Sequence, residues 1–214
     1  HSFPTRRSSD LLRQMRTAGQ GFARKNLHFT KICAILEIEN LYLEVKVQMF
    51  EVNAYLMYAK CGVCQVAAVG EPQCAGLEAG QAYYTLRPVY GNETIFLPVD
   101  AKVALRPILA RTQAEALLGE IPALLEQYAA ERPKMEQRAL AGYYRDLLKS
   151  GEVLDALRLL GYIYGKRQGK PAYKLCQTDR LYAARAEELL CGELAVALGV
   201  PREEIAQKLS PVLA

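Results

Sequence analysis

The sequence predicts an α+β protein in which a small β module is followed by an all-α helical module. Short runs of strand-forming residues, with turns between them, fill the chain from Met49 to Asp100. After Asp100 the apolar residues recur at helical spacing instead. The 214 residues, 51% of them hydrophobic, suit one or two soluble domains. We place the boundary between the two modules near residues 105–111.

Four strands are expected in the β module. The run MFEVNAYLMYAKCGVCQVAAVGEP, residues 49–72, predicts a short strand, a turn at 59–62 and a second strand that ends at Gly70. After a glycine-containing loop, the run AYYTLRPVYGNETIFLPVD predicts two more strands joined by the turn YGNE. Short strands with small turns are typical of a strongly bent sheet or a barrel.

Five helices are expected after the β module. Thr112 and Glu115 form a capping box ahead of the first helix. The second helix runs from Pro133 to Gly151, a C-terminal glycine. The apolar stripe of the third helix consists of Val153, Leu157, Leu160 and Tyr164.

The fourth helix is the longest of the five. Thr178 and Asp179 are expected to cap it, and Gly199 is expected to end it. Pro201 then opens a last short helix. The core-facing residues of the fourth helix are Ala183, Ala186, Leu190, Leu194 and Leu198.

The net charge of +4 is distributed unevenly. Residues 1–48 carry eight Lys/Arg and four Asp/Glu, which leaves 27 − 8 = 19 basic and 23 − 4 = 19 acidic residues for 49–214. Within that neutral part, residues 132–185 hold twelve Lys/Arg against five acids, a net charge of +7. A charged run is usually a solvated helix face. This segment also contains the basic loop GKRQGKPAYK, which favours contacts with phosphates.

The residue inventory argues against an enzyme. Both histidines, His1 and His28, precede Met49, and the chain has no Trp. Catalysis by the β and helical modules would therefore lack the commonest general base and metal ligand. The phosphate-loop pattern GxxxxGK[ST] and the pattern GxSxG are also missing. We expect no catalytic residue, no cofactor and no metal.

The six cysteines are irregularly spaced and follow no secretion signal, which indicates a reduced, cytoplasmic chain. The pair CGVC at 61–64 lacks the second pair or the histidines that zinc or redox motifs need. We therefore expect Cys61 to be a turn residue and Cys64 to be a small buried residue. A thiol or zinc protein built on this pair is an alternative. No apolar window approaches the ~18 residues of a membrane span, so no membrane partner is expected.

The runs MFEV, YLMY and GVCQV, followed by YYTLRPVYGNETIFLPVD and LRPI, resemble the CarD family of bacterial transcription factors. That family shares its RNA-polymerase-interacting domain with transcription-repair coupling factor. The helical half is similar to the family's C-terminal domain in YYRDLLKSGEVLDALRLL, TDRLYAARAEELLCGELAVALGV and PREEI. The resemblance implies a Tudor-like or SH3-like β-barrel at 49–108, an α-helical DNA-contacting domain at 111–210, and a monomer.

The resemblance also implies that the β domain docks on the RNA polymerase β subunit, partly by sheet-edge pairing of the strand ETIFLPV at 93–99. Ile95 and Leu97 would fill the core, because successive side chains of a strand point to opposite faces. The predicted polymerase-binding residues are Glu93, Thr94, Phe96 and Tyr84.

The helical domain of such a protein lies along promoter DNA at the upstream edge of the melted region. Its Lys and Arg side chains contact phosphates there without reading the sequence, and they shift the equilibrium of the open promoter complex. The predicted DNA-binding residues are Arg138, Arg145, Lys149, Lys166, Arg167, Lys170 and Lys174. An adaptor that docks on polymerase but barely touches DNA is an alternative, which the salt dependence of DNA binding would distinguish.

Two positions depart from the family pattern. Asn53-Ala54 stands where the family usually has Gly-Asp, and Asn tolerates the left-handed backbone conformation that such a turn needs. Some family members carry a Trp that wedges into the DNA minor groove, at a place that falls near Gln137 here. The missing wedge leaves open how strongly the chain stabilises the open complex, and whether it activates or represses transcription, whereas contact with polymerase is less affected.

The first 48 residues are expected to be a non-native extension without function. HSFPTRRSSDL, residues 1–11, resembles the translation of a sequencing adapter, and 12–48 reads as leader sequence translated in frame. The segment LEV at 43–45 could be encoded by a ribosome-binding sequence just before Met49. We expect 1–48 to be disordered. The alternative is a basic extension that grips DNA.

Overall fold

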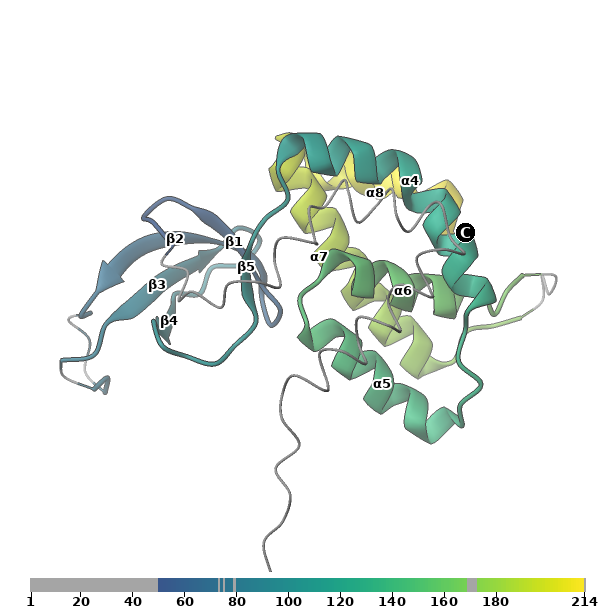
Figure 1. Cartoon of the computed structure of the whole chain (residues 1–214), viewed down its shortest axis with the longest axis horizontal. Helices are drawn as coiled ribbons and strands as arrows, with labels where there is room; N and C mark the ends of the chain where they lie inside the picture. The colour runs from purple at the N-terminus through teal and green to yellow at the C-terminus, as the bar shows by residue number, and fades with distance from the viewer. Residues whose placement is uncertain (1–49, 73, 75, 79, 169–172, 214) are drawn as a thin grey trace, which may run out of the picture. The chain divides into compact units, whose positions relative to one another are not determined.

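The computed structural model describes residues 50–213, apart from 73, 75, 79 and 169–172. The expectations for residues 1–48 therefore lie outside the described residues. The described sheet and helices belong to one compact unit. Strands come first and helices follow, which confirms the α+β class (Figure 1).

In the described residues, five antiparallel strands form a single sheet, with the order β4-β3-β2-β1-β5. The four predicted strands are all present, and β5 was missed because three residues that include a proline give too short a pattern to read. The order is open, with β4 and β5 at the two edges, so the prediction of a closed barrel is not confirmed. The strands are β1 (Tyr55–Tyr58), β2 (Gly62–Gly70), β3 (Tyr83–Pro88), β4 (Ile95–Pro98) and β5 (Leu105–Pro107).

Alternation along the strands gives the sheet a core face and an opposite face. A register shift between Val66 and Ala68 interrupts the β2–β3 ladder, an irregularity of the kind that bends a strand. On the opposite face, Met57 and Val63 pack against Leu189 of the helical module. The buried residues of the core face are Leu56, Tyr58, Cys64, Val66, Tyr84, Leu86 and Leu97.

The turn before β1 depends on an asparagine. Asn53 has a φ of 72°, and it is the one non-glycine residue with positive φ in the described part of the chain. Its backbone N–H donates to the carbonyl of Val66 at 2.7 Å, which ties the turn to β2. The expectation that Asn would supply the left-handed conformation here is confirmed.

Five helices follow the sheet in the described residues, as predicted. The helix α6 packs against both α4 and α7, and α7 also contacts β2 and α8. None of the described helices is long and apolar enough to cross a membrane. The helices are α4 (Arg111–Ala130), α5 (Gln137–Lys149), α6 (Val153–Tyr164), α7 (Gln177–Leu198) and α8 (Arg202–Leu213).

The predicted C-terminal ends of the helices agree with the structure better than the predicted N-terminal ends do. Gly151 and Gly199 both have a φ of 69° and follow the ends of α5 and α7, as predicted. The helix α5 begins at Gln137 rather than at Pro133. Residues 131–136 before it form a non-helical linker, so the predicted start is wrong by one turn.

Two predicted caps are not formed. The helix α4 begins at Arg111, and the Gln113 side chain, rather than Thr112, caps it by accepting the Ala110 N–H at 2.9 Å. Glu115 instead pairs with Arg111 at 2.9 Å.

At the start of α7 the N-cap is Cys176, whose Sγ accepts the N–H of Asp179 at 3.4 Å. Thr178 and Asp179 lie inside the first turn, so their assignment as caps is wrong. The Asp179 carboxylate is not used for capping because it binds a lysine, as described below. The predicted apolar stripes of α6 and α7 are confirmed, since their Val, Leu and Ala members are buried.

Candidate functional site

The strand β4 presents a sheet edge whose polar groups can be assigned from one hydrogen bond. The Val99 N–H donates to the carbonyl of Ala82 at 3.0 Å, in register with the β3–β4 ladder. Since antiparallel residues face their neighbour strand alternately, Leu97 and Ile95 also turn their backbone groups toward β3. The N–H and C=O of Phe96 therefore point away from the sheet. The C=O of Pro98 does so too, but it already accepts the N–H of Ala101 at 3.0 Å.

The side chains of this segment alternate as the sequence predicted. Leu97 is buried in the sheet core, and Ile95 packs against the same core. Phe96 is half-buried on the opposite face, and Thr94 and Glu93 are exposed just before the strand begins. Three predicted polymerase-binding residues, Glu93, Thr94 and Phe96, thus lie together at the sheet edge.

Tyr84 does not belong to this surface. It lies in β3 opposite Leu97, on the core face, and is only 1% exposed. Its hydroxyl accepts the backbone N–H of Phe50 at 3.1 Å, and the two rings meet edge to face at 5.9 Å. This burial argues against the prediction that Tyr84 binds polymerase, because its side chain fills the core.

Two exposed side chains that the sequence did not single out lie on the sheet face that packs against α7 through Met57 and Val63. Tyr55 of β1 pairs with Gln65 of β2, which pairs with Arg87 of β3. Tyr55 is 42% exposed, and Arg87 is exposed as well. Both share the face of Phe96, whose partner in β3 is Thr85, two residues from Arg87. Strand alternation in YYTLRP could have placed Arg87 on this face.

The cysteine pair behaves as two structural residues. Cys61 is half-buried at the β1–β2 turn, and Cys64 is buried in the sheet core, as predicted. Burial raises the pKa of Cys64 to about 12, and burial followed by the charge of Glu93 raises the pKa of Cys61. Nucleophiles and zinc ligands need the thiolate, so these shifts argue against a thiol or zinc role. Within the described residues, no group of three or more His, Cys, Asp and Glu could hold a metal ion.

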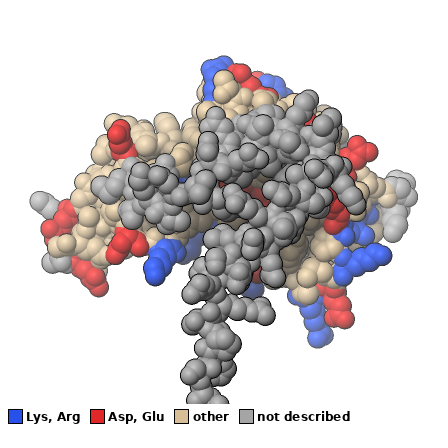
Figure 2. All heavy atoms as spheres, in the orientation of Figure 1, with Lys and Arg blue, Asp and Glu red and all other residues tan. Residues whose placement is uncertain are grey.

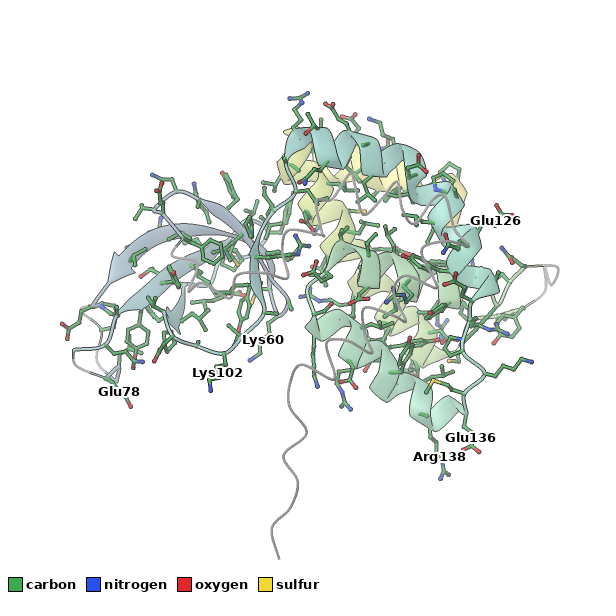
Figure 3. All side chains as sticks on the ribbon, viewed as in Figure 1. Lys60, Glu78, Lys102, Glu126, Glu136 and Arg138 are labelled. Atoms are coloured by element: carbon green, nitrogen blue, oxygen red, sulfur yellow. The ribbon has the colours of Figure 1, made fainter. Side chains whose placement is uncertain are left out.

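The helix α5 carries a basic stripe, which we define as Arg138, Arg145 and Lys149. Their spacing of seven and four residues places them on one side of the helix, and all three are exposed. Figure 3 shows Arg138 pointing away from the helical module at the start of α5, with Glu136 beside it. Basic and acidic side chains lie side by side in this region (Figure 2). The opposite side of α5 is buried through Leu140, Tyr144 and Leu147.

The basic stripe is only weakly neutralised by its own helix. Lys149 pairs with Asp146 at 3.0 Å, and the two side chains are 68% and 67% exposed. Exposed pairs of this kind contribute little and are screened by salt. A phosphate could therefore replace Asp146 as the partner of Lys149.

Lys166 is not on the surface. Its Nζ lies 2.7 and 2.8 Å from the two carboxylate oxygens of Asp179, and its side chain is only 9% exposed. Burial is the largest single influence and lowers the pKa of Lys166, but the hydrogen bond to Asp179 and the interactions with Asp179 and Tyr144 together outweigh it, so the pKa is raised. This geometry argues against the prediction that Lys166 contacts DNA, because its charge compensates a buried carboxylate.

Two further predicted DNA-binding residues, Arg167 and Lys174, follow α6 in the chain. The guanidinium of Arg167 sits 5.3 Å above the ring of Tyr164, and Lys174 is exposed. Lys170 lies outside the described residues. Of the seven predicted DNA-binding residues, the structure thus brings three together on one helix, namely Arg138, Arg145 and Lys149 on α5.

The positive charge of residues 132–185 is partly neutralised. Besides the pairs of Lys149 and Lys166, Arg158 binds Asp155 at 2.6 Å and Arg185 binds Glu188 at 2.6 Å. Four of the twelve basic residues are thus ion-paired within the described part of the chain. The basic surface is smaller than the sequence predicted.

Comparison with known families bears on the β sheet. Residues 50–109 match the family model of the CarD-like/TRCF RID domain. This range contains all five described strands, including the edge strand β4. No curated protein matches the chain significantly.

Proposed function

We propose, from the match of residues 50–109 to the family model of the CarD-like/TRCF RID domain, that β4 docks the chain on the β subunit of bacterial RNA polymerase. The single observation that carries the proposal is the edge position of β4. Its Phe96 amide and carbonyl point outward, in the arrangement that β-strand addition uses. Phe96 and Thr94 would then supply side-chain contacts next to the added strand.

The second half of the proposal assigns promoter DNA to the basic stripe of α5. Arg138 and Lys149 are separated by eleven residues, which corresponds to about 16 Å along a helix. That length matches about five base pairs of one DNA strand. Exposed Lys and Arg side chains on one helix face position a protein on phosphates without reading bases.

Simultaneous contact with polymerase and DNA would bias the promoter complex toward the conformation in which both surfaces are engaged. Such an effect is a population shift, and it includes no catalytic step. Contacts near the upstream edge of the bubble would change the stability of the open complex.

The docking proposal is tested by Phe96→Arg, with binding of the full chain to purified RNA polymerase as the measurement. We expect binding about tenfold weaker or more, equivalent to about 1.4 kcal/mol. Tyr55→Arg is the matched control, because Tyr55 is an exposed aromatic residue on the same sheet face but three strands away. Equal binding of Phe96→Arg and wild type would contradict docking at β4.

A polymerase-docking adaptor with little DNA binding is a second candidate. The observation that favours it is the pairing of four of the twelve basic residues with acids. Titration of the polymerase–promoter complex at several salt concentrations separates the two candidates. Phosphate contacts give an affinity that falls steeply with salt, whereas the adaptor adds no salt dependence beyond that of docking.

A further inference from the structure

One side chain links the sheet to two helices. Arg106 lies in β5 and pairs in register with Met57 of β1, on the face that packs against α7. Its guanidinium binds the Glu193 carboxylate of α7 through two bonds, Nη1–Oε1 at 2.5 Å and Nη2–Oε2 at 2.7 Å. Glu193 is 1% exposed and the Arg106 side chain is 12% exposed, so the pair is withdrawn from water.

The same guanidinium also holds the end of the basic helix. Its Nε and Nη2 donate to the carbonyl of Gly151, at 3.0 and 2.7 Å. Gly151 directly follows Ser150, the C-cap of α5, and the basic stripe of α5 ends at Lys149. Arg106 therefore joins the sheet, α7 and the last turn of α5 at a single point.

The neighbours of the Arg106 guanidinium favour its charged form. Burial by itself would lower the pKa of Arg106, but the hydrogen bonds and charge of Glu193, together with the charge of Glu152, outweigh it and the pKa is raised. Glu193 also accepts the backbone N–H of Leu109 at 3.1 Å, just after β5. A guanidinium has a rigid planar fork, so these bonds fix direction as well as distance.

Other contacts between the sheet and the helices are less directional with respect to α5. Leu148 of α5 packs against the cluster of Met57, Val63 and Leu189, but apolar contacts do not define orientation. The Tyr90 hydroxyl donates to the Gly192 carbonyl at 3.5 Å, and this bond reaches α7 rather than α5.

We infer that Arg106 is a positioning residue that sets where the basic stripe of α5 lies relative to the docking strand β4. The hydrogen-bonded ladder from β5 through β1, β2 and β3 to β4 makes the sheet the common frame for both surfaces. The inference rests on the proposed function, because it concerns the geometry with which that function would engage polymerase and DNA together.

The test uses the full chain with the double substitution Arg106→Met/Glu193→Met. Removing both charges avoids leaving one buried charge without its partner, which would unfold the protein. We expect polymerase binding without DNA to be unchanged, whereas the gain in affinity on promoter DNA falls about fivefold or more. The control is Arg111→Met/Glu115→Met, which removes an exposed ion pair of α4 and should change neither quantity.

A second readout measures position directly. Spin labels on non-natural amino acids at Lys102 and Asp146, both exposed, report the distance between the β4–β5 loop and α5. We expect one narrow distance distribution in the wild-type background and a broadened one in the double variant. An unchanged distribution would overturn the inference. If thermal melting shows that the double variant is unfolded, Arg106→Lys takes its place, since it keeps a cation opposite Glu193 but lacks the planar fork that also holds the Gly151 carbonyl.

The two readouts separate the inference from the proposed function. If wild type fails to bind polymerase but the label distance still broadens in the variant, the proposed function fails and the positioning role of Arg106 stands. If wild type binds polymerase and DNA, and the variant keeps both the narrow distance and the full DNA-dependent gain, the proposed function stands and the positioning role is refuted.

Discussion

Gly161 of α6 lies so close to Tyr128 of α4 that a Cβ built on the glycine would be 2.6 Å from the Tyr128 Cβ. The backbone carbonyl of Leu125 would be 2.9 Å from the same Cβ. Gly165, one turn later, meets Ala129 in the same way at 2.5 Å. The α4–α6 contact, which organises the helical module, thus requires two glycines on one side of α6.

Gly161→Ala should therefore destabilise the protein, by about 1–3 kcal/mol, because overpacking forces two backbones apart. The measurement is the free energy of unfolding from denaturant titration. The matched control is Gly119→Ala in α4, where a Cβ would meet nothing within 4 Å. That change should stabilise the helix by up to about 1 kcal/mol. Equal effects of the two substitutions would contradict the close approach.

The buried pair of Lys166 and Asp179 should make stability sensitive to high pH. The pKa of Lys166 is raised, so the stability that the pair contributes is complete below the ordinary lysine pKa of about 10.4. This stability is lost as pH rises through the higher pKa of the folded state. Melting temperatures from pH 7 to pH 11 should fall more steeply for wild type than for the paired variant Lys166→Met/Asp179→Leu.

Breaking that pair on one side should cost more than removing it. Lys166→Met leaves Asp179 buried without its cation, a loss of about 3–5 kcal/mol by comparison with other buried pairs. Lys208→Met is the control, since Lys208 pairs with Glu204 at 2.8 Å on an exposed helix surface. Similar melting temperatures for Lys166→Met and Lys208→Met would show that Lys166 is solvated after all.

Thiol labelling should distinguish the cysteines by burial. Burial raises the pKa of Cys64 to about 12 and that of Cys191 to about 11, and Cys74 is exposed. With iodoacetamide at pH 8, Cys74 should react before Cys64 and Cys191, as followed by peptide mass spectrometry. Fast labelling of Cys64 in the folded protein would reopen the thiol alternative.

Reversing two charges of the basic stripe should weaken the DNA-dependent gain in affinity. For Arg138→Glu/Arg145→Glu, the slope of log K against log salt should become shallower by roughly 1.8, since each lost phosphate contact removes about 0.9. Arg111→Glu is the control, because Arg111 is exposed on α4, outside the stripe. An unchanged slope would favour the adaptor candidate.

The elements that local patterns define were predictable from the sequence. The stripe from Ala183 to Leu198, the stop at Gly199 and the left-handed Asn53 each follow from spacing or from one residue type. The same holds for the alternation that separates Phe96 from Leu97 at the sheet edge.

The features that depend on distant partners were not predictable. In the sequence, Lys166 looks like one of several cations of the basic loop GKRQGKPAYK, because its partner Asp179 lies thirteen residues further along the chain. Tyr83 and Tyr84 are adjacent in β3, so their side chains face opposite sides of the sheet, but alternation alone does not tell which of the two faces the core. The sequence-based prediction placed Tyr84 on the surface. The link from Arg106 to Glu193 spans 87 residues and has no local signal.

The strand β4 ends with Pro98, and this has a consequence for solubility at high concentration. On the outward side of β4, Pro98 has no N–H to donate, so Phe96 supplies the one outward backbone donor within the strand. Edges that offer long rows of donors and acceptors recruit copies of themselves and grow into aggregates. A four-residue edge with a single donor can bind a partner that adds side-chain contacts of its own. It offers too few backbone hydrogen bonds for identical copies of the chain to add to the sheet one after another.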